Sequence, residues 1–101
     1  FLYVDDLADA CLFIMNACAG SETLNIGTGR GISIAELAQL IGQVVGYQGR
    51  IVFDSEKPDG TPVKITATDR LNALGWFPAV TLEAGLVRTY KWFLDNYGER
   101  L

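Results

Sequence analysis

The feature that most constrains this chain is a polar loop at residues 54–64, Asp-Ser-Glu-Lys-Pro-Asp-Gly-Thr-Pro-Val-Lys. It holds two of the chain's three prolines. Its Pro-Asp-Gly sequence at 58–60 predicts a tight turn, because proline fixes φ and glycine accepts positive φ. On a stiff loop, Lys57 and Lys64 offer ammonium groups to an anion, and Asp59 offers a carboxylate to a hydroxyl or N–H donor. The alternative interpretation is a solvated connector that carries no chemistry.

Residues 33–46 carry the clearest helix signals in the sequence. Ser33 and Glu36 fit a capping box, in which each side chain accepts a hydrogen bond from a backbone N–H of the first turn. Apolar residues then recur at helical spacing, and Gly46 is placed to end the helix in a left-handed conformation. A helix over 34–45 with one buried face is therefore predicted.

Three further helices are expected. The first covers residues 7–17, with Asp5 or Asp6 as its N-cap, and is apolar around most of its circumference, which predicts more than one packing partner. A brief helix begins at Thr68 or Asp69. The last helix follows a Thr81 cap, and its inner face is predicted from the helical spacing of its apolar residues, Leu82, Leu86, Tyr90, Phe93 and Tyr97.

Short extended segments are predicted between these helices. Residues 1–4, 23–26 and 50–54 are interpreted as strands, and 65–67 as a short extended run. Strands that alternate with helices predict an α/β unit. Trp76 and Phe77 lie in the connector before the last helix, and both are expected to fill the core of this α/β unit.

The glycines at 27, 29 and 31 invite comparison with phosphate-binding loops. Their G-x-G-x-G spacing does not match the dinucleotide fingerprint G-x-G-x-x-G. We interpret the segment as a tight connection into the following helix that needs positive φ. No cofactor-binding residue is predicted in this chain.

Composition and charge exclude several classes of function. The formal net charge of −4 argues against a general nucleic-acid binder, which needs a basic face. No apolar run reaches the ~20 residues of a membrane span. The chain contains no histidine, and Cys11 and Cys18 are not in ligand spacing, so no metal site is expected. Both cysteines are interpreted as buried small side chains of a cytoplasmic protein rather than as a disulfide.

Several sequence blocks are together typical of one enzyme family. They are Phe-Leu-Tyr-Val-Asp-Asp-Leu-Ala-Asp-Ala at 1–10, Asn-Ile-Gly-Thr-Gly at 25–29, Ser-Ile-Ala-Glu-Leu at 33–37, the run from 52 to 64, Leu-Gly-Trp at 74–76 and Thr-Tyr-Lys-Trp-Phe-Leu at 89–94. In them the chain resembles the C-terminal portion of the GDP-L-fucose synthases, which are GDP-4-keto-6-deoxy-mannose epimerase/reductases of the extended short-chain dehydrogenase/reductase superfamily. The first two blocks are shared widely among nucleotide-sugar epimerases and dehydratases. The Lys-Pro-Asp-Gly-Thr-Pro loop is much more specific to the fucose-synthase branch.

The resemblance implies a larger parent enzyme, and the apolar opening without an initiating methionine also favours a fragment. Residues 1–29 would be terminal pieces of a Rossmann domain, and residues 30–101 the C-terminal substrate-binding region. NADP would be bound by the missing N-terminal domain, which would also supply every catalytic residue. The parent is expected to be a cytoplasmic homodimer, and this segment alone is expected to be inactive.

For the site, the resemblance implies that Lys64 contacts the substrate diphosphate and that Asp59 contacts the GDP-sugar. Lys57 and Arg70 are further substrate-binding candidates. One departure is notable, since relatives usually carry an aspartate where this chain has Ala67. If that aspartate orders the loop, then Thr66, Thr68 or Asp69 must do so here. The alternatives are a fragment of another nucleotide-sugar epimerase or dehydratase, and a non-catalytic small α/β binding module.

Overall fold

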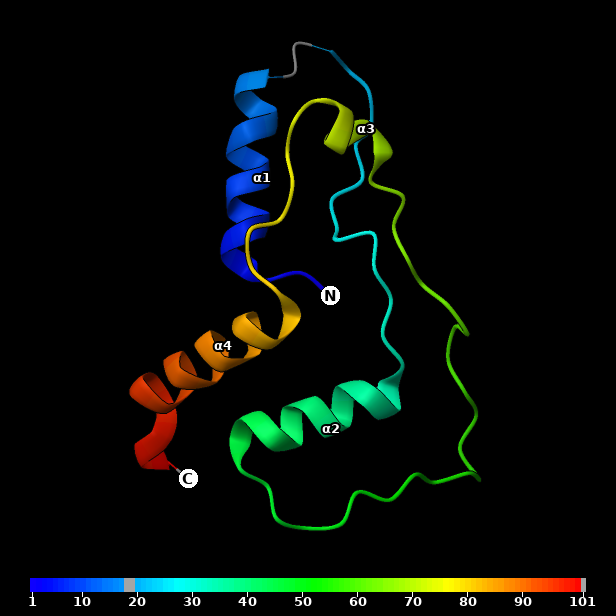
Figure 1. Cartoon of the computed structure of the whole chain (residues 1–101), viewed down its shortest axis with the longest axis vertical. Coiled ribbons are helices and arrows are strands. Elements are labelled where there is room, and N and C mark those ends of the chain that lie inside the picture. The colour runs from blue at the N-terminus through cyan, green and yellow to red at the C-terminus, as the bar shows by residue number, and fades with distance from the viewer. Residues whose placement is uncertain (18–19, 101) are drawn as a thin grey trace.

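The computed structural model describes residues 1–17 and 20–100, and within these ranges the regular structure is entirely helical (Figure 1). The helices are α1 (Val4–Ala17), α2 (Ile34–Val45), α3 (Asp69–Ala73) and α4 (Leu82–Tyr97), followed by a short 3-10 helix η1 (Gly98–Arg100). Cys18 lies outside the described residues. None of the described helices is long and apolar enough to cross a membrane.

Helix α2 forms as its local signals predict. The Ser33 hydroxyl oxygen accepts a hydrogen bond from the Glu36 backbone N–H at 3.1 Å. Glu36 Oε2 in turn accepts from the Ser33 backbone N–H at 3.0 Å and from the Ser33 hydroxyl at 2.7 Å. These hydrogen bonds to the carboxylate lower the Glu36 pKa. Gly46 ends the helix with φ of 71°, so the capping box and the glycine cap are both confirmed.

Helix α1 begins three residues earlier than the sequence predicts. The Leu7 N–H donates to the Tyr3 carbonyl, so Asp5 and Asp6 lie within the first turn and neither is the N-cap. The predicted strand over residues 1–4 is likewise not observed. The Asp6 side chain has another role, because its Oδ2 accepts a hydrogen bond from the Val80 backbone N–H at 2.9 Å.

The predicted strands at 23–26 and 50–54 are also absent from the described part of the chain, and 65–67 forms no strand. These segments are irregular, and no ladder of backbone hydrogen bonds joins any two of them. A strand exists only when a neighbouring strand accepts and donates its backbone hydrogen bonds. The α/β expectation is therefore not confirmed by this structure.

The core forms where α1, α3 and the 74–81 connector meet. Its buried residues are Ala10, Leu71 and Trp76, packed against Leu2, Phe13, Ile14 and Ile26. The Trp76 indole N–H donates to Asp9 Oδ2 at 2.9 Å, which fixes the connector along α1 (Figure 1). Phe77 was expected in the core but is 63% exposed. Residues 76–79 form neither helix nor strand, and Phe77 lies beside a cavity next to the 28–32 turn instead of in the core.

Helices α2 and α4 form a second packed unit, side by side at the other end of the molecule (Figure 1). The predicted inner face of α4 is half-buried from Leu82 to Phe93, with Thr81 capping the helix by accepting from the Ala84 N–H at 3.2 Å. Tyr97 is 42% exposed, so the inner face ends near Phe93. The Tyr97 ring lies against the Phe93 ring, with 5.9 Å between centroids.

The molecule is open in shape. Its radius of gyration is 16.8 Å, whereas a compact domain of this length has about 13 Å. Helix α1 leaves Leu7, Leu12 and Met15 exposed, which agrees with the expected need for more than one packing partner. Cys11 is also exposed, contrary to prediction, because it lies on this uncovered side of α1.

Candidate functional site

The residues predicted to bind substrate lie on the long irregular segment between α2 and α3 and on α3 itself. Lys57, Asp59 and Lys64 are in the irregular segment, and Arg70 is in the first turn of α3. All four are exposed, and none forms a hydrogen bond or ion pair with another described side chain. The structure therefore leaves their charged groups available to a ligand, but it does not gather them into one cavity.

The turn in the loop is displaced from its predicted position. Asp54 Oδ1 accepts a hydrogen bond from the Glu56 N–H at 3.0 Å, and the Asp54 carbonyl accepts from the Lys57 N–H at 3.3 Å. Residues 58–60 form no turn, and Gly60 does not adopt positive φ. The predicted Pro-Asp-Gly turn is wrong, because an aspartate that bonds its own backbone two residues later makes a turn already at residue 54.

At the exit of the loop, Thr66 and Thr68 flank Ala67. Thr68 is buried, and its hydroxyl oxygen accepts a hydrogen bond from Asn72 Nδ2 at 3.2 Å. Thr66 is half-buried, whereas Ala67 and Asp69 are exposed. Of the three candidates, Thr66 and Thr68 are thus the packed ones. Thr68 is the N-cap of α3 by position, but its side chain does not cap the helix.

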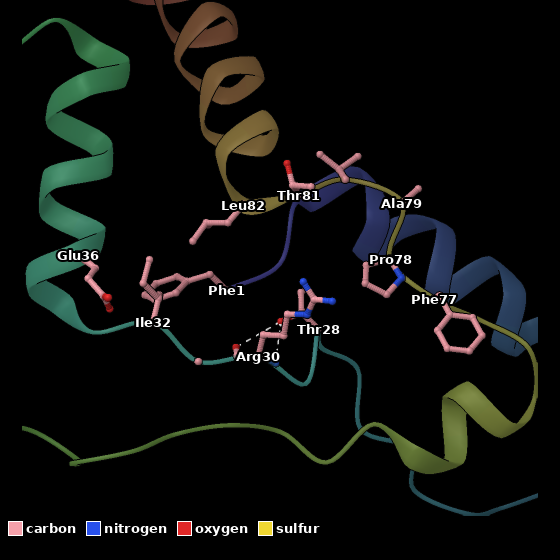
Figure 2. A pocket seen from close by; sticks show the side chains of 12 residues that line it. Phe1, Thr28, Arg30, Ile32, Glu36, Phe77, Pro78, Ala79, Thr81 and Leu82 are labelled. Carbon is pink, nitrogen blue, oxygen red and sulfur yellow. Dashed lines mark hydrogen bonds between the residues drawn. The ribbon is translucent and has the colours of Figure 1, made fainter.

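A cavity of about 650 Å³ lies between the 28–32 turn, the start of α2 and the connector before α4 (Figure 2). The Arg30 side chain points into it, and the Arg30 N–H donates to the Thr28 hydroxyl oxygen at 3.2 Å. Glu36 also lines it, but its carboxylate is engaged in the α2 cap. Sequence reasoning missed this cavity, since its walls come from segments that only the fold brings together.

A smaller groove of about 260 Å³ runs between α2 and α4. Its lining is aliphatic and aromatic, with hydroxyl groups on Thr89 and Tyr90, and the Thr89 hydroxyl donates to the Gly85 carbonyl at 2.8 Å. No group of three acidic, cysteine or histidine side chains in the described ranges could hold a metal ion. These surfaces offer packing and one cation at Arg30, but no nucleophile paired with a base.

The glycine segment at 27–31 does not form a cofactor cradle. Gly29 has the expected positive φ, of 70°, but the space beside Gly27, Gly29 and Gly31 is filled by side chains of residues 65–68. A pyrophosphate needs that close backbone approach for itself. The residues of this segment therefore do not fit a dinucleotide.

The sequence of this chain is similar to those of known proteins. No family model matches the chain. Probable GDP-L-fucose synthase 1 of Oryza sativa subsp. japonica is 51% identical over 96 residues, covering 95% of this chain and 29% of the relative. GDP-L-fucose synthase of Escherichia coli (strain K12) is 49% identical over 105 aligned positions, covering 95% of this chain and 33% of the relative. The chain thus spans a third or less of the length of these relatives.

A solved structure agrees with the sequence comparison. MlghC, a GDP-mannoheptose C4 reductase from Campylobacter jejuni with NADP bound, superposes with a TM-score of 0.73 and 29% identity. The match covers 88% of this chain and 29% of that one. Since the similarity runs through nearly all of this chain and is confined to one end of the relatives, the chain is homologous to the C-terminal portion of the GDP-L-fucose synthases.

Proposed function

We propose that this chain is the substrate-binding portion of an NADP-dependent GDP-4-keto-6-deoxy-mannose epimerase/reductase that makes GDP-L-fucose. The observation that carries the proposal is the identity of 49–51% to two GDP-L-fucose synthases over 95% of the chain. The oxidoreductase chemistry is assigned to regions of such an enzyme that this sequence does not cover. By itself the chain is expected to show no NADPH oxidation.

The ligand of the loop is then the nucleotide-sugar. We assign Lys64 to the diphosphate and Asp59 to a hydroxyl or N–H donor of the nucleotide-sugar, with Lys57 and Arg70 as further cations near the phosphates. The exposure of all four and their lack of internal partners support this assignment, since no ion pair has to break before a ligand binds. A diphosphate attracts ammonium and guanidinium groups through charge-assisted hydrogen bonds.

These residues bind and orient the substrate, and none of them moves a proton in the reaction. A lysine that meets the diphosphate contributes the same interaction before and during the chemical step, so it lowers KM rather than raising kcat. Arg70 is held by the first turn of α3, and Lys64 lies close before the buried Thr68. Lys64 and Arg70 are thus attached close to the buried Thr68, whereas Lys57 lies at the Asp54 turn.

NADP is assigned to the part of the enzyme outside this chain, because the 27–31 glycines are covered by residues 65–68. When bound there, the nicotinamide would supply the hydride for the reduction. In the same proposal, residues 1–29 belong to the Rossmann domain and residues 30–101 to the substrate-binding region. A homodimeric parent and a cytoplasmic location complete the proposal and rest on the resemblance alone.

A second candidate is a reductase or epimerase for another GDP-sugar. The similarity to a GDP-mannoheptose C4 reductase favours it, because that protein shares the backbone arrangement at 29% identity. The GDP moiety would be bound by the same loop in both cases, so the two candidates differ in the sugar. A non-catalytic binding module has no comparable support from the relatives.

The test is a chimaeric enzyme in which this chain replaces the aligned C-terminal portion of the Escherichia coli synthase. We expect it to oxidise NADPH with GDP-4-keto-6-deoxy-mannose and to form GDP-L-fucose, with the unmodified Escherichia coli enzyme as the positive control. A chimaera that folds and binds NADPH but turns over only a GDP-heptose would establish the second candidate. One that folds and binds no GDP-sugar would contradict both.

A further inference from the structure

The cavity beside Arg30 combines an unpaired side-chain cation with walls that are largely apolar (Figure 2). The Arg30 guanidinium forms no ion pair or hydrogen bond with the residues described, 1–17 and 20–100. Glu36 also lines the cavity, but its carboxylate accepts hydrogen bonds from Ser33 and forms no ion pair with Arg30. The positive charge of Arg30 is therefore available to a ligand inside the cavity.

Aromatic side chains line the same cavity and have surface to spare. Phe77 is 63% exposed and Phe1 is 67% exposed, and both are part of the lining. Aromatic rings with free surface hold planar ligands by stacking. A guanidinium adds parallel N–H donors in a fixed plane, which suits a pair of acceptors on one edge of a ligand. The volume of about 650 Å³ lies within the roughly 300–1,000 Å³ of small-molecule sites.

These features fit a nucleobase better than a phosphate. A diphosphate carries more than one negative charge, and part of that charge would be desolvated against apolar walls without a partner if Arg30 alone faced it. A neutral base instead brings an apolar face and hydrogen-bond acceptors at its edge, which one guanidinium satisfies. Guanine presents two such acceptors, O6 and N7, on a single edge, and arginine is their commonest bidentate partner.

We propose that Arg30 is a specificity-determining residue that binds the guanine base of the GDP-sugar in this cavity, donating to O6 and N7. The cavity adjoins the loop to which the diphosphate is assigned. Gly31 is part of the cavity lining and packs on Ile65, which directly follows Lys64. This inference rests on the function proposed above, since that function supplies the GDP-sugar as the ligand.

The test compares GDP with 7-deaza-GDP, in which a C–H group replaces N7, by isothermal titration calorimetry on the chimaeric enzyme. In the unmodified chimaera, 7-deaza-GDP should bind roughly three- to tenfold more weakly than GDP, because one of two hydrogen bonds from Arg30 is lost. In Arg30→Ala, GDP should bind roughly ten- to hundredfold more weakly, and the difference between the two ligands should disappear.

Two further variants and one further ligand control this result. Arg30→Lys keeps the charge but not the planar fork, so it should also lose the preference for GDP over 7-deaza-GDP. UDP lacks the edge with two acceptors and should bind equally to the unmodified chimaera and to Arg30→Ala. The matched control Arg50→Ala removes another exposed arginine, outside the cavity, and should change none of these affinities. NADPH binding, measured in parallel, should be the same in every variant and reports that each is folded.

The outcomes separate the inference from the function on which it rests. A chimaera that binds NADPH but no GDP would mean that the proposed function is wrong, and the inference fails with it. If Lys64→Ala weakens GDP binding and Arg30→Ala does not, only the role of Arg30 is overturned. An equal loss of affinity for GDP, 7-deaza-GDP and UDP in Arg30→Ala would show that Arg30 meets the phosphates, which overturns its assignment to the base.

Discussion

Two carboxylates of α1 show how single residues organise this chain. Asp9 accepts the Trp76 indole N–H and Asp6 accepts the Val80 backbone N–H, each at 2.9 Å. Together they fix the connector that leads into α4. The sequence suggested only a capping role for Asp6, because the partners lie 67 and 74 residues away and no local pattern indicates a contact at that separation.

Asp6→Ala tests this contact. Asp6 is only 6% exposed, so its removal leaves the Val80 N–H without a partner in a poorly solvated place. We expect a loss of about 1–3 kcal/mol in the free energy of unfolding of the chimaeric enzyme's C-terminal portion. Asp6→Asn keeps an acceptor oxygen and should lose less. Denaturant unfolding followed by tryptophan emission measures both, and equal stability of Asp6→Ala and the unmodified protein would contradict the assignment.

Lys64 and Asp59 carry the prediction for ligand binding. In the chimaeric enzyme, Lys64→Ala should raise KM for the GDP-sugar with little change in kcat, at a cost of about 1.5–3 kcal/mol in kcat/KM. Asp59→Asn keeps the size and one acceptor oxygen, so it should weaken binding less than Asp59→Ala. Steady-state kinetics with each substrate varied measures these effects.

The control for Lys64→Ala is Lys91→Ala, which removes another exposed lysine, paired at 2.7 Å with Asp95 on α4. It should leave both KM values unchanged. A loss of NADPH affinity in Lys64→Ala, with GDP-sugar binding intact, would mean that the loop serves the other ligand.

At the scale of elements, the sequence predicts a helix end correctly where the residues that cap it are close together in the sequence. The α2 capping box, its glycine cap and the Thr81 cap of α4 depend on residues within one or two turns, and all were predicted correctly. The strand predictions were wrong, since a strand needs a partner strand for its backbone hydrogen bonds and the sequence of one segment does not show whether a partner lies beside it. The loop turn failed because Asp54 bonds its own backbone before the Pro-Asp-Gly sequence is reached.

In the candidate site, too, features that depend on neighbouring residues could be predicted and features that depend on distant residues could not. The charged residues of the loop could be named from the sequence, and all of them are exposed in the structure. The cavity beside Arg30 and the packing of Thr68 and Ile65 on the glycines could not, because each is made by segments more than thirty residues apart in the printed sequence.

The α2 capping box gives a pH prediction. Hydrogen bonds from Ser33 lower the Glu36 pKa below its ordinary value of 4.5, so the carboxylate stabilises the folded state fully above about pH 4.5. This contribution is lost as the pH falls through the lowered folded-state value. In Ser33→Ala those hydrogen bonds are weakened, so the stability of the protein should fall less between about pH 5 and pH 3 than in the unmodified protein. Thermal unfolding at several pH values measures the difference, and parallel pH profiles would contradict it.

At the scale of the whole molecule, the open shape leaves apolar surface without internal partners. The exposed side of α1 includes Leu7, Leu12 and Met15, and large exposed apolar surfaces are often sites of interaction with other protein. Under the proposed function, the covering surface is the remainder of the enzyme.

The isolated chain of residues 1–101 should therefore bind a hydrophobic dye and self-associate. Its residues 7–17 should exchange backbone hydrogens faster than residues 34–45, whose helix is capped at both ends and packed on α4. Size-exclusion chromatography and hydrogen exchange with mass spectrometry measure this. A clean monomer with α1 as well protected as α2 would contradict it.

The hydrogen bond between Trp76 and Asp9 also gives the protein an internal optical reporter. Trp76 is buried and bonded to α1, whereas Trp92 is 57% exposed on α4. Indole emission moves to longer wavelength when the ring becomes hydrated, so the two tryptophans should emit in separable bands. Separation of α1 from the connector would change the Trp76 band and leave the Trp92 band in place. With Trp92→Phe as the background, docking of α1 on the 74–81 connector could be followed in real time without any attached label.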